Sequence, residues 1–297
     1  MGDILKRTFL GTDGKLRFIW RFILFVLISV AAAFAVGGPF AAFVTGRVTI
    51  RPGLSPEGIA LGEAVNFIAA FVPTAIFAVY EWRRIDSYGL PIGRALGEHT
   101  FEGFFIGVAF VAAVALGMIA LGGMQINGFA LTGHALTMAA LAWLGANILV
   151  GIAEEFYFRH YVQETLWKSI GFWPAATVIA LLFAAIHYFL KPGENIWDVI
   201  TLVSFSLLMS YSVVQTGTLW FAVGFHCAFD YMQIFVIGTP NGGRTPVDRM
   251  LDVSFHGPAW ITGGSLGTEA SFLVYPLMLL LWLYLWARYG ESPGRLP

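Results

Sequence analysis

Eight apolar runs, each about as long as a membrane-spanning helix, dominate this 297-residue chain. A helix needs roughly 20 residues to cross the hydrocarbon core of a bilayer. Because 58% of the residues are hydrophobic and only 12% are charged, the composition excludes a soluble domain. The sequence therefore predicts an all-α fold, a polytopic membrane helical bundle of about eight transmembrane helices. The runs cover residues 19–44, 61–80, 101–121, 138–166, 172–190, 198–215, 218–237 and 270–287.

Two of these runs allow a second interpretation. The sixth run is short and rich in serine, which a helical bundle tolerates through hydrogen bonds. The first run follows basic residues and contains Ala33-Phe34-Ala35, which resembles a signal-peptide cleavage site. Since the apolar stretch extends past that point, we expect a retained span.

The runs form one integral-membrane domain at residues 19–287, with its candidate motifs in a core at about 138–237. A basic lead-in at 1–18 precedes it, and a tail at 288–297 follows it. The Gly- and Pro-rich segment 238–269 is expected to be an ordered cap or a mobile loop.

The distribution of basic residues predicts the orientation. About eleven Lys and Arg residues would lie on the side of the two termini and five on the other side. By the positive-inside rule both termini are cytoplasmic. We expect a multi-pass protein of a bacterial inner (cell) membrane.

The overall charge says little about binding partners, whereas the cysteine content excludes disulfide and cysteine–zinc sites. The formal net charge is −1, and no basic patch indicates nucleic acid. The single cysteine, Cys227, excludes an intrachain disulfide and a cysteine-based zinc site.

Ionisable side chains inside the apolar runs are the strongest functional signal. A charged side chain at the centre of a spanning helix costs about 2.5–3.5 kcal/mol, so such groups must contact one another, water or a ligand. Six of them lie in the fourth, fifth and seventh runs: Glu154, Glu155, Arg159, His187, His226 and Asp230.

The fourth run contains an acid–base pair and a second acid. Glu155 and Arg159 are four residues apart with the acid first, the favourable order for a helical ion pair, so we expect them mainly to neutralise each other and shape the site. Glu154 points about 100° away on the helix. It is either a general base that accepts a proton from water or a carboxyl group that hydrogen-bonds another helix. Asn147, seven residues before Glu154, lies on nearly the same face and is a candidate supporting residue.

His187 is expected at the same depth as Glu154. The turn between the fourth and fifth runs falls near residues 168–171. Both side chains then lie about 21–24 Å from it along antiparallel helices. Phe183, one turn before His187, is expected to pack beside its ring. Taken alone, His187 also fits an interfacial histidine.

His226 and Asp230 are again four residues apart. The carboxylate can reach the imidazole and fix its orientation, as it does for catalytic or metal-bound histidines. The alternative is a buried hydrogen-bonded pair without a chemical role.

These residues resemble a known family. Glu154-Glu155-Phe156-Tyr157-Phe158-Arg159, Phe183-Ala184-Ala185-Ile186-His187 and His226-Cys227-Ala228-Phe229-Asp230 are similar to the three ordered motifs of the CPBP intramembrane proteases. This family includes the type II CAAX prenyl endopeptidases and bacteriocin-processing or bacteriocin-immunity proteins. The resemblance covers about 150–232. Glu81-Trp82-Arg83-Arg84 before Tyr88-Gly89-Leu90 also resembles the basic loop of the family.

One position departs from the pattern of the eukaryotic CAAX enzymes. Their last motif ends in Asn, whereas this chain has Asp230. Bacterial members use either residue, so Asp230 argues against a prenylated CAAX substrate rather than against membership.

The resemblance implies hydrolysis of a peptide bond in a membrane-associated protein or peptide, at a site open to the cytoplasm. We expect Glu154, helped by His187, to deprotonate a water molecule, and His226, oriented by Asp230, to stabilise the oxyanion. Glu154, His187 and His226 also have the ligand types of a His₂Glu zinc site. The sequence thus leaves two alternatives, no cofactor or a divalent metal such as Zn.

Two other classes of protein fit the same residues. A non-catalytic membrane partner, such as an immunity or scaffold protein, would not need Glu154 for its function. A proton-coupled transporter would use buried Glu and His residues as a relay. The paired discontinuous helices typical of transporters are not evident in the sequence.

Overall fold

The computed structural model describes residues 6, 8–11, 14–191 and 195–290. The first span is a continuous helix in three parts, α2 (Phe18–Ala32), the π-helical turn η1 (Ala33–Gly37) and α3 (Gly38–Thr45). The other long elements are α4 (Pro56–Glu81), α5 (Glu98–Ala120), α6 (Gly133–Arg159), α7 (Tyr161–Ile170), α8 (Phe172–Leu190), α9 (Ile196–Thr216), α10 (Trp220–Asp230) with its π-helical extension η4 (Tyr231–Ile237), and α12 (Val274–Tyr289).

The structure confirms the all-α membrane bundle. Within the described residues, seven helical segments are long and apolar enough to cross a membrane. The eighth predicted run is also helical, but α12 has only 16 residues, about 24 Å at 1.5 Å per residue. The run at 138–166 is divided at His160, where the backbone leaves helical geometry between α6 and α7.

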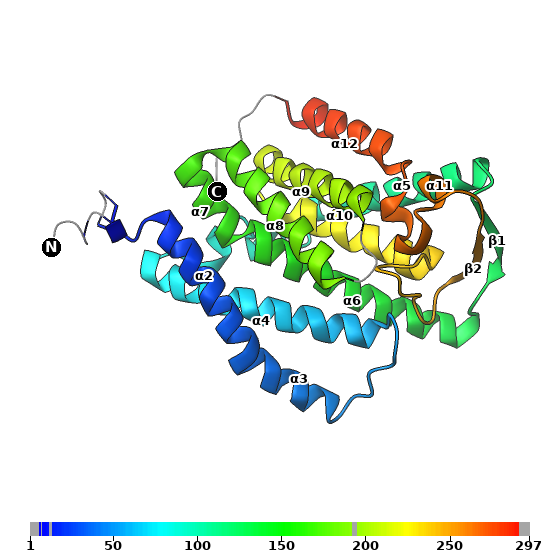
Figure 1. Cartoon of the computed structure of the whole chain (residues 1–297), viewed down its shortest axis with the longest axis horizontal. Helices are drawn as coiled ribbons and strands as arrows, with labels where there is room; N and C mark the ends of the chain where they lie inside the picture. Colours follow the sequence, from blue (N-terminus) through cyan, green and yellow to red (C-terminus); the bar gives the residue numbers. More distant parts are fainter. Residues whose placement is uncertain (1–5, 7, 12–13, 192–194, 291–297) are drawn as a thin grey trace.

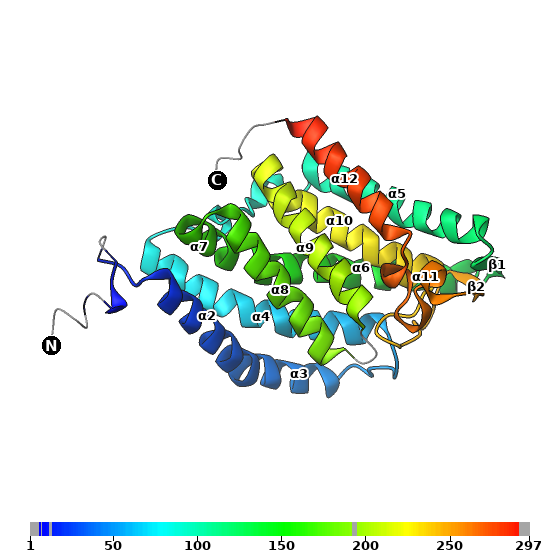
Figure 2. The same ribbon diagram turned by 45° about the horizontal axis from the view of Figure 1, so that its top comes forward.

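Successive spans run in opposite directions, so the bundle has two distinct ends (Figure 1). The end where α2 begins, which we call the N-terminal end, also holds the end of α4 and the turn between α7 and α8. The opposite end, which we call the hairpin end, holds the start of α4 and the end of α8. Figure 2 shows the same arrangement from a second direction.

A two-stranded antiparallel sheet lies at the hairpin end and was not expected from the sequence. Strand β1 (Met124–Phe129) pairs with β2 (Leu251–Phe255), with an irregularity between Ile126 and Gly128. The strand β2 belongs to the segment 238–269, which also contains the short helix α11 (Ala259–Thr262). This segment is therefore an ordered cap.

Glycines let the central helices approach closely. A Cβ atom at Gly224 of α10 would lie 2.1 Å from the backbone oxygen of Thr100, and one at Gly103 of α5 would lie 2.1 Å from that of Phe221. On the other side of α10, a Cβ atom at Gly151 of α6 would lie 2.8 Å from the oxygen of Val223. Small residues at such crossings allow backbones to pack directly in membranes. Gly151 thereby brings the Glu154–Glu155 turn of α6 against α10.

We expect Gly224→Ala to destabilise the bundle by about 1–3 kcal/mol or more, because the backbone of α5 must move to admit the methyl group. Gly145→Ala on α6 is the matched control, since a Cβ atom there meets nothing within 4 Å. Thermal unfolding of the purified variants in detergent measures both effects. Equal unfolding temperatures for the two variants would contradict this packing argument.

The basic loop after α4 ties the N-terminal end together. Arg21 pairs with Glu81 at 2.7 Å, and Arg83 pairs with Glu164 of α7 at 2.5 Å. Burial and the Glu81 carboxylate raise the pKa of the Tyr88 phenol, so Tyr88 stays protonated and donates to Glu81 at 3.1 Å. The loop therefore has a structural role in the arrangement of α2, α4 and α7.

Candidate active site

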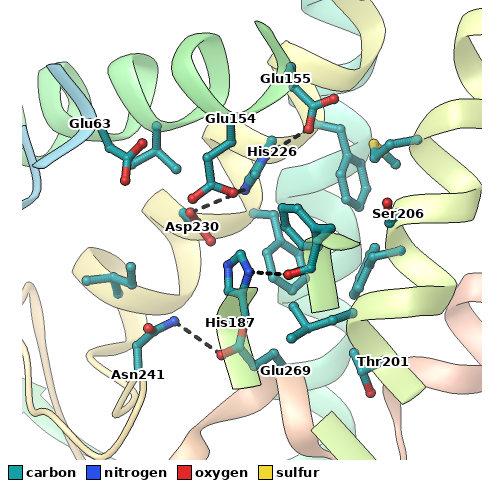
Figure 3. A pocket seen from close by; sticks show the side chains of 18 of the residues that line it. Glu63, Glu154, Glu155, His187, Thr201, Ser206, His226, Asp230, Asn241 and Glu269 are labelled. Carbon is teal, nitrogen blue, oxygen red and sulfur yellow. Dashed lines mark hydrogen bonds and ion pairs between the residues drawn. The ribbon is translucent and has the colours of Figure 1, made fainter. Parts of the chain in front are cut away.

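A polar cavity of about 130 Å³ lies inside the bundle, between α4, α6, α8, α9 and α10 (Figure 3). All six ionisable residues singled out from the apolar runs line it, so the fold brings together side chains from three separate helices. They are joined there by Glu63 of α4 and by Asn241 and Glu269 of the cap.

Glu155 and Arg159 form the expected ion pair at the inner end of the cavity. Arg159 Nη1 lies 2.7 Å from Glu155 Oε1, and each side chain is only 1% exposed. Arg159 Nη2 also donates to Ser206 Oγ of α9 at 2.8 Å. At this buried position each charge needs the other as its partner, because a buried charge without a partner strongly destabilises the fold.

His226 is held by Glu155. Its Nδ1 atom lies 3.0 Å from Glu155 Oε1, whereas its Nε2 atom lies 3.7 Å from both Glu154 Oε2 and Asp230 Oδ2. A carboxylate paired with Arg159 can only accept, so Nδ1–H is the donor. The imidazole therefore directs Nε2 towards Glu154 and Asp230.

This geometry corrects one expectation. Spacing along the helix predicted that Asp230 would orient His226, but the hydrogen bond that fixes the ring comes from Glu155 on the neighbouring helix. Asp230 instead accepts from Gln233 at 3.0 Å and faces Nε2 at a longer distance. The i, i+4 spacing predicts contacts within one helix only. Because α6 and α10 cross closely at Gly151, Glu155 of α6 lies nearer to His226 than Asp230 does.

Glu154 has an unsatisfied acceptor at the cavity. Its side chain is 16% exposed, and within the described part of the chain its Oε2 atom has no hydrogen-bond partner. Buried polar atoms are normally satisfied by protein or by ordered water. Oε2 is therefore well placed to bind a water molecule beside His226.

His187 enters the cavity from α8 with its ring orientation fixed. Nδ1 lies 2.9 Å from the carbonyl oxygen of Phe183, which can only accept, so Nδ1 carries the proton and the unprotonated Nε2 is available as an acceptor. The Phe183 ring packs against the imidazole with centroids 4.3 Å apart, as expected. His187 and Glu154 line the same cavity, in agreement with the predicted depth match.

Asn147 lies apart from this group. It is fully buried in α6, where its Nδ2 atom donates to the carbonyl oxygen of Trp143 at 2.9 Å. It does not line the described cavity. The sequence placed it on the right helical face, but two turns of helix separate it from Glu154 along the axis.

Glu63 is one of the polar cavity residues that the sequence analysis missed. It projects from α4 towards the same region as Glu154 and Asp230 (Figure 3) and lies close enough to both, and to His226, to interact electrostatically. Its carboxylate accepts from Asn66 Nδ2 at 3.3 Å. An acid inside an apolar run is by itself a functional signal. Its place near the start of the second run made it resemble an ordinary helix-end residue.

We expect Glu63→Gln to slow substrate cleavage about tenfold, because the amide removes a titratable group that interacts electrostatically with Glu154, His226 and Asp230. Glu57→Gln, six residues earlier on the same helix and paired with Arg51, serves as the control. Initial rates of peptide cleavage by the purified variants provide the comparison. A Glu63→Gln enzyme as fast as the control would remove Glu63 from the site.

The residues proposed as zinc ligands do not form a metal centre in this geometry. Within residues 14–191 and 195–290, no group of three or more His, Cys, Asp or Glu side chains is arranged to hold a metal ion. The chemistry below is therefore derived from the side chains alone.

A second cavity, of about 340 Å³, adjoins the first between α2, α4 and α8. Glu63, Glu154, His187 and Lys191 line both cavities. The remaining lining is mostly apolar and faces outward through side chains such as Val30, Ile186 and Leu190, which are 51%, 40% and 78% exposed. The second cavity therefore lies between the polar site and an exposed apolar surface of the bundle.

Residues 136–232 match the family model described as type II CAAX prenyl endopeptidase, Rce1-like. Within this segment the chain is similar to that family. The match runs from α6 into η4 and includes the three motifs, so it confirms the resemblance seen in the sequence. A comparison with curated proteins finds no match. Together with the apolar helices, the family match supports an integral, multi-pass membrane protein.

The position of the cavity bears on the expected orientation. Its lining reaches Lys191, Asn241 and Glu269, all at the hairpin end, whereas the termini of the bundle lie at the N-terminal end. Cytoplasmic termini and a site open to the cytoplasm were both expected. Both stay predictions.

Proposed function

We propose that the protein is an intramembrane endopeptidase that hydrolyses a peptide bond of a membrane-associated protein, with water activated by Glu154. The observation that supports this most is the unsatisfied Glu154 carboxylate oxygen, which faces a polar cavity large enough to hold water beside an oriented His226. The similarity to the Rce1-like family gives the reaction class, because that family is one of peptide-bond hydrolases.

The cavity residues fit the steps of hydrolysis. A water bound to Glu154 Oε2 attacks the scissile carbonyl carbon as Glu154 takes its proton. The C–N bond then breaks, and Glu154 returns that proton to the departing amine. His187 Nε2, as an acceptor on the same cavity wall, holds the attacking water in place.

His226 is placed to stabilise the oxyanion. When its imidazole is doubly protonated, Nδ1–H donates to Glu155 and Nε2–H faces the cavity. A donor preorganised in a site shielded from bulk water stabilises developing negative charge strongly. Glu155 and Arg159 act through His226 as positioning residues, because they hold the ring from the side away from the cavity.

The second cavity provides a path for a membrane-anchored substrate. Its apolar lining lies between α2 and α8, and it shares Glu154 and His187 with the polar site. A hydrophobic segment in the bilayer can therefore approach from the side, while the peptide bond next to it enters the polar cavity.

We expect Ala33→Trp, which fills this side path, to reduce cleavage of a membrane-anchored substrate about tenfold. Cleavage of a short soluble peptide should be unaffected, because it does not need the path. Phe34→Trp is the control, since Phe34 is 79% exposed and outside the cavity lining. Equal loss with both kinds of substrate would show that the path is not used. Assays in proteoliposomes with the two substrates measure the difference.

The proposed function is tested by comparing new protein termini in membranes of the native host. Cells carry either the wild-type chain or Glu154→Ala at matched expression. Termini that appear only with wild type establish proteolysis and name its substrates. Indistinguishable profiles would favour the non-catalytic partner.

A further inference from the structure

Three polar side chains in the second cavity have no part in the reaction described above. Ser29 of α2, Asn66 of α4 and Tyr157 of α6 line this cavity, and none of them lines the polar cavity of about 130 Å³. Apart from these three and the residues shared by both cavities, the lining is apolar: Val30, Ala33, Ala69, Phe158, Ile186 and Leu190. Polar groups from three helices therefore face one largely apolar cavity.

Ser29 has a buried hydroxyl group without a partner. The residue is 1% exposed, and no described residue forms a hydrogen bond with its Oγ atom. It lies 11 residues after the start of the first span, Phe18–Thr45, and 16 before its end, which places it about 17 Å and 24 Å from the two ends. Buried polar atoms are normally satisfied by the protein or by a bound molecule such as water. The Ser29 hydroxyl is therefore available to a molecule that enters the cavity near the middle of the span.

Asn66 and Tyr157 add further hydrogen-bonding capacity. Asn66 Nδ2 donates to the Glu63 carboxylate at 3.3 Å, and its Oδ1 atom can accept. Tyr157 is held through its ring, whose centroid lies 5.1 Å from that of Phe158, and its phenol can donate or accept. The cavity can therefore bind both N–H and C=O groups.

These groups fit a peptide backbone better than a lipid chain. An acyl or prenyl chain has no hydrogen-bonding groups and would leave the Ser29 hydroxyl without a partner. A peptide backbone has one donor and one acceptor at almost every residue. Within a helix these groups are paired with each other, so only an extended stretch can offer them to the cavity.

Cleavage itself requires such a stretch. A scissile carbonyl inside a helix is hydrogen-bonded and shielded by neighbouring side chains, so the substrate must unwind before water can reach it. Backbone groups that lose their helical partners away from water are costly until other partners replace them. The second cavity shares Glu154 and His187 with the first, so an unwound stretch bound there continues directly to the candidate catalytic residues. The π-helical turn η1 also begins at this cavity, with Ala33, and such turns within α-helices are frequent at functional sites.

We propose that the second cavity binds an unwound, extended stretch of the substrate next to the scissile bond, with Ser29, Asn66 and Tyr157 as hydrogen-bond partners of its backbone. The cleavage of that substrate rests on the proposed function, whereas the backbone binding rests on the polar groups of the second cavity. Because backbone groups are common to all residues, this binding tolerates different substrate side chains.

Replacement of single amides by esters in a probe peptide tests the proposal. The probe is a synthetic peptide with a membrane anchor of about 20 Leu and Ala residues that continues into a short Gly-rich segment. Each ester in this segment removes one N–H donor and keeps the length of the chain. Binding is measured in proteoliposomes with Glu154→Gln as the parent, so that cleavage does not interfere.

At least one ester should weaken binding to the parent about three- to tenfold, the effect of losing one hydrogen bond. With Ser29→Ala added to the parent, the same ester should not weaken binding further, because the acceptor is already gone. Ser204→Ala is the matched control, since Ser204 Oγ donates to the Ile200 carbonyl oxygen at 2.7 Å and Ser204 lines neither cavity. This control should keep the full ester effect.

Ester effects of equal size with and without Ser29→Ala would overturn the proposal, as would a probe that does not bind at all. Complete displacement of the probe by an acyl or prenyl chain, with no ester effect, would overturn it in favour of a lipid subsite. Incubation of the all-amide probe with the wild-type chain tests the protease function separately. An intact probe that shows the Ser29-dependent ester effect would refute the proposed function alone, and a cleaved probe that lacks this effect would refute the subsite alone.

Discussion

Glu154→Gln is expected to slow peptide cleavage by about 10²–10⁴-fold, the range that a general base contributes. The amide keeps the size of the side chain but cannot accept the proton of the attacking water. Because Glu154 makes no ion pair shorter than 3.7 Å with any residue that the structure describes, we expect the fold to be unchanged. The measurement is kcat/KM of the purified variant on a substrate identified from the new termini.

The control for this prediction is Glu98→Gln. Glu98 begins α5 at the N-terminal end, and its side chain is 82% exposed. This variant should cleave at the wild-type rate. A Glu154→Gln enzyme within a few-fold of that rate, with a normal unfolding temperature, would show that another group activates the water.

Arg159→Met is expected to lower the free energy of unfolding by about 3–5 kcal/mol, because it leaves Glu155 as a buried charge without its partner. The exposed control is Arg84→Met, whose side chain is 84% exposed and whose pair with Asp86 should contribute little to stability, because solvent screens it. Equilibrium unfolding in mixed micelles measures both values.

A double variant separates the structural role of this pair from its role at the site. Glu155→Gln with Arg159→Met removes both charges, so most of the lost stability should return. Activity should stay low, since His226 Nδ1 no longer has a charged acceptor. If the double variant regained activity together with stability, Glu155 would have no part in positioning His226.

Much of the site could be predicted from the sequence, because its key pairs are local. The i, i+4 spacing of Glu155 and Arg159 gave an ion pair that the structure contains. Phe183 and His187 pack together as their helical spacing predicts. The similar depth of Glu154 and His187 could be predicted from the number of residues that separate each of them from the turn between their helices.

Contacts between elements that are distant in sequence could not be predicted in this way. The hydrogen bond from His226 to Glu155 depends on the approach of α6 and α10 at Gly151, which one helical wheel does not reveal. The sheet of β1 and β2 pairs segments more than a hundred residues apart, and each strand is too short to give a clear alternating pattern. Glu63 was missed because its partners come from other helices.

The bundle end that the cavity lining reaches also required the fold. The sequence predicted the depth of Glu154 and His187 relative to one turn, but not which bundle end the cavity would reach. The positions of Lys191, Asn241 and Glu269 around the cavity resolve this point.

The most direct test of the account is whether the purified chain, alone in proteoliposomes, hydrolyses a membrane-anchored peptide. Mass spectrometry of the products gives the answer. The account predicts two fragments whose masses sum to that of the substrate plus one water, formed by wild type and not by Glu154→Gln. A substrate that binds the wild-type protein and remains intact would contradict it.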